Sequence, residues 1–255
     1  VLNRSTQALN RSLERLSSGL RINRAADDAA GLAIAEGFRS QVRGTQVAQR
    51  NAQDGVSLVQ TAEGARSETT NILQRIRELA VQAANGTQST TNRIALDNEV
   101  KQLLGQIDSI AKDTQFNGIS VLSVNQTVTL QAGAMTSQTL VIAVNGAKTS
   151  DLGVNAVNLS TISTAVSAIS TIDRALQSVT SLRSSFGAYQ NRLEFTINTL
   201  AIQEENSSAS ESAIRDANIA AETIGFTRNQ ILVSAGTSVL AQANVVPQTA
   251  LQLLR

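Results

Sequence analysis

The sequence contains no cysteine, no histidine and no tryptophan among its 255 residues, and it has a single proline. Without cysteine the chain cannot form a disulfide, a thiolate metal site or a thiol nucleophile. Without histidine it lacks the commonest general base, the commonest metal ligand and any Ser-His-Asp triad. Lysine occurs at positions 101, 112 and 148, and although Ser109 and Lys112 have the Ser-x-x-Lys spacing, neither a Ser-Asp-Asn nor a Lys-Thr-Gly motif accompanies them. The sequence therefore predicts a protein that is not an enzyme and that needs no cofactor or metal.

Net charge and long apolar runs are also scarce. The net charge of +1 at pH 7 gives no global reason to expect a nucleic acid or an anionic membrane as a partner. The arginine-rich start of the chain has no interleaved aromatic residues of the kind that stack on bases. No apolar run approaches the ~20 residues that span a bilayer. We therefore expect neither nucleic acid nor membrane among the partners.

The longest pattern that is present is an apolar repeat from Ile162 to Leu200. Its apolar residues recur at steps of three or four, and no proline interrupts it. A helix of about 40 residues with a rise of 1.5 Å per residue would be roughly 60 Å long. So long an apolar stripe needs other long helices beside it for its burial.

Other segments supply such helices. Apolar spacing predicts helices over residues 28–85 and 90–112, alternation predicts a β-hairpin over about 119–146, and Gly225-Phe226 marks a weak boundary near the end. Both ends carry heptad-like seams, which are candidate assembly surfaces: Leu9, Leu13, Leu16, Leu20, Leu232, Val239, Leu240 and Val246. The expected fold is mainly α, an elongated bundle of long antiparallel coiled-coil-like helices with a small β-hairpin region. The alternative for the seams is burial within the chain's own core.

The two ends of the chain also carry opposite charge. Residues 1–50 hold eight arginines and four acidic residues, whereas residues 190–225 hold two arginines and six acidic residues. Net charges of +4 and −4 on two helical segments favour their side-by-side pairing, although each exposed ion pair contributes only ~0–1 kcal/mol. The alternative is two solvated faces of unlike sign.

Several longer motifs resemble those of bacterial flagellin. They are Glu-Arg-Leu-Ser-Ser-Gly-Leu-Arg-Ile-Asn at 14–23, the Asp-Asp-Ala-Ala-Gly run at 27–31, the segments 73–82 and 114–118, and Ala-Gly-Thr-Ser-Val-Leu-Ala-Gln-Ala-Asn at 235–244. Motifs in order over nearly the whole chain make a specific signal. Relative to the family pattern we expect a shortened first helix and no large variable outer domain, because residues 147–161 only bridge that position.

The resemblance implies a structural subunit that self-assembles into the hollow helical filament used for motility. It implies an inner filament domain from residues 1–28 and 215–255, and a rod of long helices with the hairpin from 29–214. The implied location is extracellular, after secretion, and the implied partners are the chain itself, an export chaperone and the filament cap. Two alternatives stay open: a hook–filament junction protein, and a cell-surface flagellin homologue that binds a ligand.

A candidate binding surface lies in the segment 74–82. Helical periodicity places Ile76, Leu79 and Ala80 toward a core and leaves Arg75, Arg77 and Glu78 outside. The resemblance implies recognition of this segment by Toll-like receptor 5 and its use in subunit contacts, with five candidate contact residues: Arg75, Leu79, Glu99, Gln74 and Gln82. The alternative is an ordinary solvated helix face.

A metal site is one interpretation of the adjacent acidic residues Asp27 and Asp28. They have no further ligands nearby in the sequence, so we expect them at a helix N-terminus, where the helix dipole favours negative charge.

Overall fold

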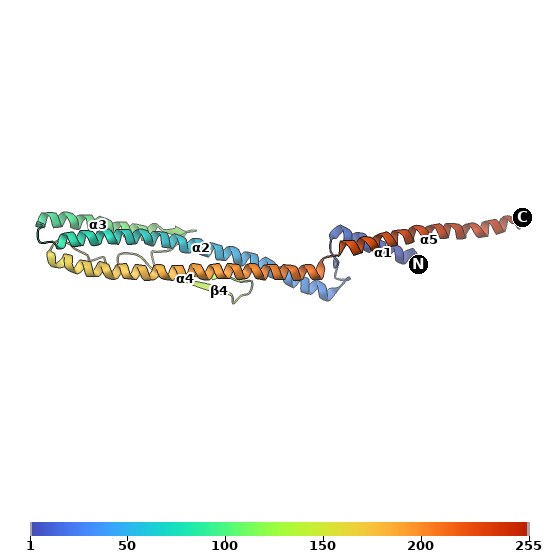
Figure 1. The fold of residues 1–255 in the computed structure, drawn as a ribbon, viewed down its shortest axis with the longest axis horizontal. Helices are drawn as coiled ribbons and strands as arrows, with labels where there is room; N and C mark the ends of the chain where they lie inside the picture. The colour runs from blue at the N-terminus through green and yellow to red at the C-terminus, as the bar shows by residue number, and fades with distance from the viewer. Residues whose placement is uncertain (1, 254–255) are drawn as a thin grey trace. The chain divides into compact units, whose positions relative to one another are not determined.

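The computed structural model describes the backbone of residues 2–253 and the side chains of residues 2–243, and it is mainly helical. In chain order the elements are α1 (Leu2–Ser18), α2 (Ala29–Ala84), α3 (Thr90–Asp113), β1 (Gln115–Phe116), β2 (Ile119–Ser120), β3 (Gln126–Gln131), β4 (Thr139–Val144), α4 (Ile162–Arg215) and α5 (Ile219–Leu253). Figure 1 shows α2, α3 and α4 lying alongside one another. The expected mainly helical fold with long packed helices is confirmed.

Side-chain caps explain where three of the helices begin. Asp28 precedes α2, and its Oδ1 accepts a hydrogen bond from Gly31 N at 2.9 Å. Ser89 caps α3 by accepting from Asn92 N at 3.1 Å. Thr161 Oγ1 accepts from the backbone N–H of Thr164 at 3.2 Å, next to the start of α4. These contacts satisfy amide groups that the first helical turn leaves without partners, and they confirm the expectation for Asp28.

The first two strands form a minimal hairpin. β1 and β2 pair antiparallel, with Phe116 opposite Ile119. The intervening Asn117 and Gly118 both have positive φ, at 50° and 77°. Asn-Gly is the sequence that favours such a turn, because glycine and asparagine tolerate the left-handed region.

The larger hairpin is the one expected from residues 119–146. β3 and β4 pair antiparallel, from Gln126 opposite Val144 to Gln131 opposite Thr139. Leu140, Ile142 and Val144 are buried while the residues between them are more exposed, as alternation requires. The hairpin therefore packs one face on the helices.

The hairpin packs on α2 at glycine positions. A Cβ built on Gly55 would lie 2.3 Å from Leu130 Cδ1, and one built on Gly44 would lie 2.9 Å from Ala134 Cβ. Between them, Asn51 Nδ2 donates to Gln131 O at 3.1 Å. These glycines weaken α2 as a helix, but their lack of a side chain admits the strands.

The chain divides into two compact units, Val1–Arg43 with Gln203–Arg255, and Gly44–Ile202. The second unit contains two apolar clusters. One joins α2, α3, the N-terminal part of α4 and the loop before α4, and includes Leu79, Ile107 and Ile172. The other joins α2, the β3–β4 hairpin and the middle of α4 around Phe186 and Leu193. The two clusters thus bury the long apolar stripes of these helices, as the apolar repeats predict.

Arg66 lies in this second cluster and is fully buried. Its Nη2 donates to the carbonyl of Asn145, and its guanidinium carbon lies 5.2 Å from the centre of the Phe186 ring. Burial lowers the pKa of Arg66 to about 10, because the charged form loses its hydration. The side chain ties α2 to the residue that follows β4.

Two expected boundaries near the C-terminus were wrong. The helix expected to end at Leu200 continues to Arg215, and Gly225-Phe226 is not a boundary because α5 runs through it. The break falls instead before Asn218, whose Oδ1 accepts from Ala221 N at 3.1 Å and so caps α5. Gly225 is where α5 approaches α1, since a Cβ there would lie 3.8 Å from Ser12 Oγ.

Candidate interaction surfaces

Helices α1 and α5 pack against each other in the first unit. Ser5 and Ser12 are the buried residues of α1. On α5, a Cβ built on Gly236 would lie 3.0 Å from Leu2 Cδ1. Small side chains at the contact let two helices approach closely, so this seam is built on serine and glycine as much as on leucine.

One ion pair crosses the same contact. Arg15 Nη1 lies 3.8 Å from Glu222 Oε2, and both side chains are partly buried. Arg15 belongs to the basic segment 1–50 and Glu222 to the acidic segment 190–225. The pairing of oppositely charged ends that the sequence favours is therefore realised at this point.

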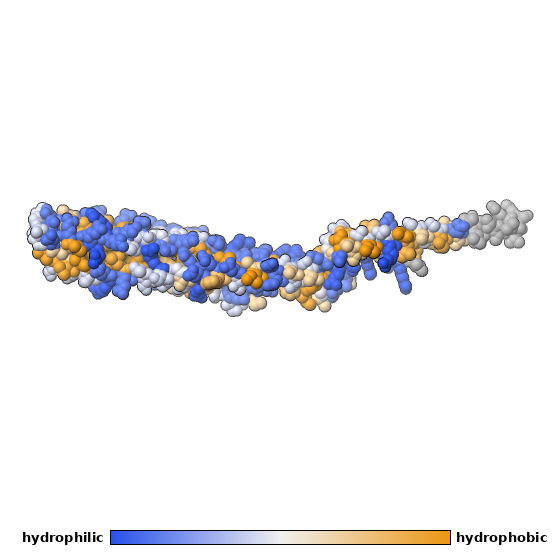
Figure 2. Space-filling model, in the orientation of Figure 1, coloured by the Kyte–Doolittle hydropathy of each residue, from blue (hydrophilic) through white to orange (hydrophobic). Residues whose placement is uncertain are grey.

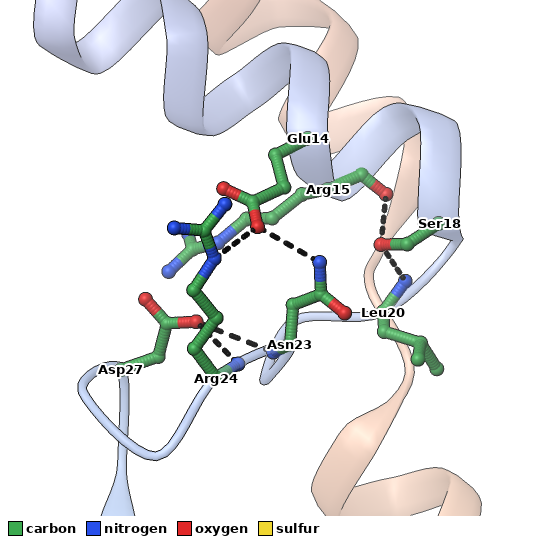
Figure 3. A network of polar contacts seen from close by, with 7 residues as sticks. All are labelled: Glu14, Arg15, Ser18, Leu20, Asn23, Arg24 and Asp27. Atoms are coloured by element: carbon green, nitrogen blue, oxygen red, sulfur yellow. Dashed lines mark hydrogen bonds and ion pairs between the residues drawn. The ribbon is translucent and has the colours of Figure 1, made fainter.

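A polar network shapes the connector between α1 and α2 (Figure 3). Glu14 Oε1 accepts from Arg24 Nε at 2.7 Å and from Asn23 Nδ2 at 2.9 Å. Asp27 Oδ2 accepts from the backbone N–H groups of Arg24 and Asn23, and these two bonds hold the pKa of Asp27 below its ordinary value. Gly19 supplies the positive φ of 73° that ends α1. Residues of the N-terminal motif at 14–23 thus fix the conformation of this connector through local hydrogen bonds.

Hydrogen bonds join the connector between α1 and α2 to the connector between α4 and α5. Arg21 N donates to Arg215 O at 2.7 Å, and Ala217 N donates to Gly19 O at 2.9 Å. The guanidinium of Arg21 adds a bond from Nη2 to Ile214 O at 2.6 Å. Both connectors belong to one compact unit, so the end of α1 and the start of α5 share a common anchor.

The predicted seam residues lie in different environments. Leu9, Leu16 and Leu20 are half-buried, whereas four others are exposed: Leu13, Leu232, Val239 and Leu240. Val246 lies outside the residues whose side chains are described. The exposed members have no cover within the part of the chain that the structure describes.

Helix α5 is apolar on more than one side. Phe226 and Val233 are partly covered on the side that α1 occupies. Ile231 and Val239 lie on another side and are exposed, Val239 by 68%. Figure 2 shows apolar residues in orange over the region of α1 and α5. A helix that is apolar on several sides is normally covered on several sides, so α5 is a surface that requires a partner.

The Arg75 surface is a charged contact between α2 and α3. Arg75 Nη2 lies 3.0 Å from Glu99 Oε1, and its Nη1 lies 3.1 Å from Glu78 Oε2. Both carboxylates raise the pKa of Arg75, with Glu99 contributing most. All three side chains are well exposed. The structure thus brings together Arg75 and Glu99, which are 24 residues apart in the sequence.

The remaining predicted contact residues divide between surface and core. Gln74 and Gln82 are exposed beside Arg75. Leu79 is only 1% exposed and lies in the core with Ile76 and Ala80. The helical period that exposes Arg75 turns Leu79 inward, and the role of Leu79 as a contact residue stays a prediction.

The structure also bears on a metal site and on a membrane-spanning helix. Among the described residues, no group of three or more acidic residues has the spacing of a metal site. Within the same described part of the chain, no helix combines the length and the apolar character needed to cross a membrane.

Family patterns match both ends of the sequence. The bacterial flagellin N-terminal helical region matches residues 1–127, and the bacterial flagellin C-terminal helical region matches residues 169–254. The flagellin of Halalkalibacterium halodurans is 48% identical over 248 residues, which cover 96% of this chain and 91% of that protein. The chain belongs to the bacterial flagellin family.

Other flagellar proteins support this membership. The flagellar filament 31.3 kDa core protein of Treponema maltophilum is 42% identical over 272 residues, covering 100% of this chain and 95% of that protein. The crystal structure of Bacillus cereus flagellin is 36% identical, with a TM-score of 0.53, and covers 59% of this chain and 88% of that one. A putative flagellar hook-associated protein of Vibrio parahaemolyticus shares the fold, with a TM-score of 0.63 over 74% of this chain and all of that one, at 12% identity.

As a flagellin, the protein is a structural subunit of the extracellular flagellar filament rather than an enzyme, and it self-assembles. The hook–filament junction alternative has a likeness of fold alone in its favour. Family membership over both helical regions agrees with the first interpretation of the motifs.

Sequence reasoning missed the residues that join the two terminal helices of this flagellin. It sought leucine seams, whereas Ser5, Ser12 and Gly236 make the close contact. A signal was present, because small residues recur at seven-residue intervals in α1. The hydrogen bonds between the two connectors could not be predicted from residue types, since backbone groups make most of them.

Proposed function

We propose that this flagellin polymerises through α1 and α5, with residues 1–28 and 215–255 forming the inner layer of the filament and residues 29–214 the rod outside it. The observation that carries the proposal is the exposed apolar side of α5, opposite no other described element. Covering this side on a neighbouring copy removes apolar surface from water, at about 25 cal/mol per Å². Head-to-tail contacts of this kind extend into an open helical polymer.

Seeded elongation tests the proposal. Filament fragments are mixed with the monomeric chain, and the growth rate is measured by microscopy. Ile231→Asn and Val239→Asn should each slow elongation by about tenfold, because an uncompensated amide enters an apolar contact. The matched control is Gln230→Asn, an exposed polar position on the same helix. Normal growth of both apolar variants, or no growth of the wild-type chain, contradicts the proposal.

The same exposed side of α5 is the surface on which we place the export chaperone before assembly. A chaperone that binds apolar helical surface would keep α5 from premature association during transport. The filament cap would then receive the released chain at the growing end. Ile231→Asn should weaken co-purification with the chaperone, while Gln230→Asn should leave it unchanged.

The Arg75 surface supports a second candidate contact, with Toll-like receptor 5. Arginine provides a planar, multi-donor anchor of the kind that dominates interfaces, and here Arg75 is exposed. Arg75→Ala should reduce receptor activation in a cell reporter assay while changing the free energy of unfolding by no more than about 1 kcal/mol. The control is Arg77→Ala, an exposed arginine paired with Asp173 at 2.6 Å.

A separate variant tests whether Leu79 contacts the receptor directly or only stabilises the fold beneath the Arg75 surface. Leu79→Ala should destabilise the rod by about 2–5 kcal/mol, because it removes a buried leucine from the core. Any loss of receptor activation by this variant should therefore follow its loss of folding, measured by circular dichroism at the assay temperature. Full activation by Arg75→Ala eliminates the direct contact.

A further inference from the structure

Two exposed mixed stripes lie in the second compact unit, outside the surfaces already described. The α2 stripe consists of Val47 and Arg50, which are three residues apart and so share a face of the helix. The α4 stripe consists of Glu194, Phe195 and Ile202. Phe195 is 72% exposed, Ile202 61% and Val47 46%. By contrast, Phe186 on the same helix is only 1% exposed.

Each stripe points away from the core that joins the two helices. Ala52 and Val56 of α2 are buried in the same cluster as Phe186 and Leu193 of α4. The stripes lie on the solvent-exposed sides of these helices, so they face different sides of the unit. They cannot cover each other within one molecule.

The charged members of the stripes are unpaired within the described part of the chain. Arg50 and Glu194 are both exposed, and neither takes part in an ion pair or a side-chain hydrogen bond there. The α2 stripe thus has a free positive charge at Arg50, with the exposed Asp54 one turn further along the same side of the helix, and the α4 stripe has a free negative charge at Glu194. Two such surfaces are complementary.

We propose that the α2 stripe of one copy docks on the α4 stripe of a second copy. The proposal rests on the polymerisation argued above and names a rod contact within it. Because the two stripes are different surfaces, the contact is heterologous and leaves one stripe of each type free at the ends. It can therefore repeat indefinitely, as a filament requires.

The positions of the two stripes along their helices predict an axial shift between the two copies. Gly55 and Leu193 lie at the same level, since a Cβ on Gly55 would be 3.3 Å from Leu193 Cδ2. Two parallel copies set flush would therefore place Asp54 opposite Glu194, which is unfavourable. A shift of one helical turn, about 5.4 Å, places Arg50 opposite Glu194 and leaves Val47 between Phe195 and Ile202.

The absence of cysteine permits a cross-linking test of this geometry. A chain carrying both Val47→Cys and Asn198→Cys is elongated from filament seeds, oxidised with diamide, and separated on a non-reducing gel. The staggered contact predicts a ladder of covalent dimers, trimers and longer chains. The flush alternative, Val47→Cys with Ile202→Cys, should cross-link at least about fivefold more slowly, since disulfides require Cα atoms within roughly 7 Å.

Charge reversal provides an independent measurement. Arg50→Glu and Glu194→Arg should each slow elongation of wild-type seeds by about tenfold, because like charges then meet at the contact. The matched controls are Lys112→Glu and Glu68→Arg, two exposed charges elsewhere in the same unit. Circular dichroism should show all four variants folded as monomers, since none of these side chains is buried.

The outcomes separate this contact from polymerisation itself. A wild-type chain that fails to elongate seeds contradicts the proposed assembly through α1 and α5. Normal wild-type growth without a ladder, a ladder that stops at dimers, or equal effects of the stripe and control charges overturns the stripe contact alone. Binding of a different protein to the α4 stripe, with no cross-linking between copies, also overturns it.

Discussion

Glycine residues of α2 differ in what surrounds them. Gly55 is buried where Leu130 of the hairpin and Leu193 of α4 meet the helix, so a methyl group has no room there. Gly64 is exposed and has no atom within 4 Å of its built Cβ. The same residue type is thus required by packing at one position and is only a helix weakness at the other.

Two alanine substitutions should therefore have opposite effects on stability. Gly55→Ala should lower the free energy of unfolding by about 1–3 kcal/mol, because the added methyl group overpacks the hairpin contact. Gly64→Ala should raise it by about 0.5–1 kcal/mol through helix propensity. Urea denaturation followed by circular dichroism measures both. A stabilising Gly55→Ala would show that the hairpin can move away at little cost.

At the scale of elements, α3 holds two loops in place with buried and half-buried polar side chains. Arg93 Nε donates to Ala83 O at 2.9 Å and so caps the end of α2. Asp97 Oδ1 accepts from Leu159 N at 2.8 Å, and Asp108 Oδ1 accepts from Thr149 N at 2.8 Å. The loop between β4 and α4 is therefore fixed to α3 at both ends.

Removing one of these acceptors should loosen the loop. Asp97→Ala leaves the buried N–H of Leu159 without a partner, which costs about 1–3 kcal/mol. Asp97→Asn keeps an acceptor oxygen and should cost less, although it removes the ion pair with Lys101 at 2.7 Å. Thermal unfolding ranks the variants, and faster amide exchange at residues 147–160 locates the change. Equal melting temperatures for wild type and Asp97→Ala would contradict this account.

At the scale of the whole molecule, the two compact units differ in how much core they have. Among the described residues, Ile22 and Ala35 are the fully buried apolar residues of the unit that contains α1 and α5. The other unit contains both large apolar clusters. Helices with little buried apolar surface are marginal in water, so α1 and α5 depend more on partners than the helices of the other unit do.

Native-state hydrogen exchange should resolve this difference. Amides of α1 and α5 should exchange in the monomer with opening free energies of no more than about 2 kcal/mol, whereas amides around Ile76 and Ile172 should approach the global stability. Assembly onto filament seeds should slow exchange in α1 and α5 by orders of magnitude. Protection of α1 and α5 in the monomer equal to that of the amides around Ile76 and Ile172 would show that their cover lies within the chain.

The bounds of α2 and α3 could be predicted from particular residues. The starts and ends of α2 and α3 fell within one residue of expectation, because their caps and apolar spacing are local in sequence. The inward side of the segment 74–82 followed from its period. The same period buries Leu79, whose role as a contact residue comes from the family resemblance and stays a prediction. The late end of the fourth helix was missed, since Arg215 follows a polar stretch whose helicity depends on neighbouring elements.

The helical class, the positions of most helices and the family could all be predicted from the amino-acid sequence, because caps, periodic apolar residues and long motifs are properties of short stretches of chain. Which apolar residues are covered is set by tertiary packing. Burial depends on what comes alongside from distant parts of the chain: α1 covers one side of α5, and no described element covers Ile231 or Val239. The surfaces available for assembly are what remains after that packing, and no local pattern could identify them.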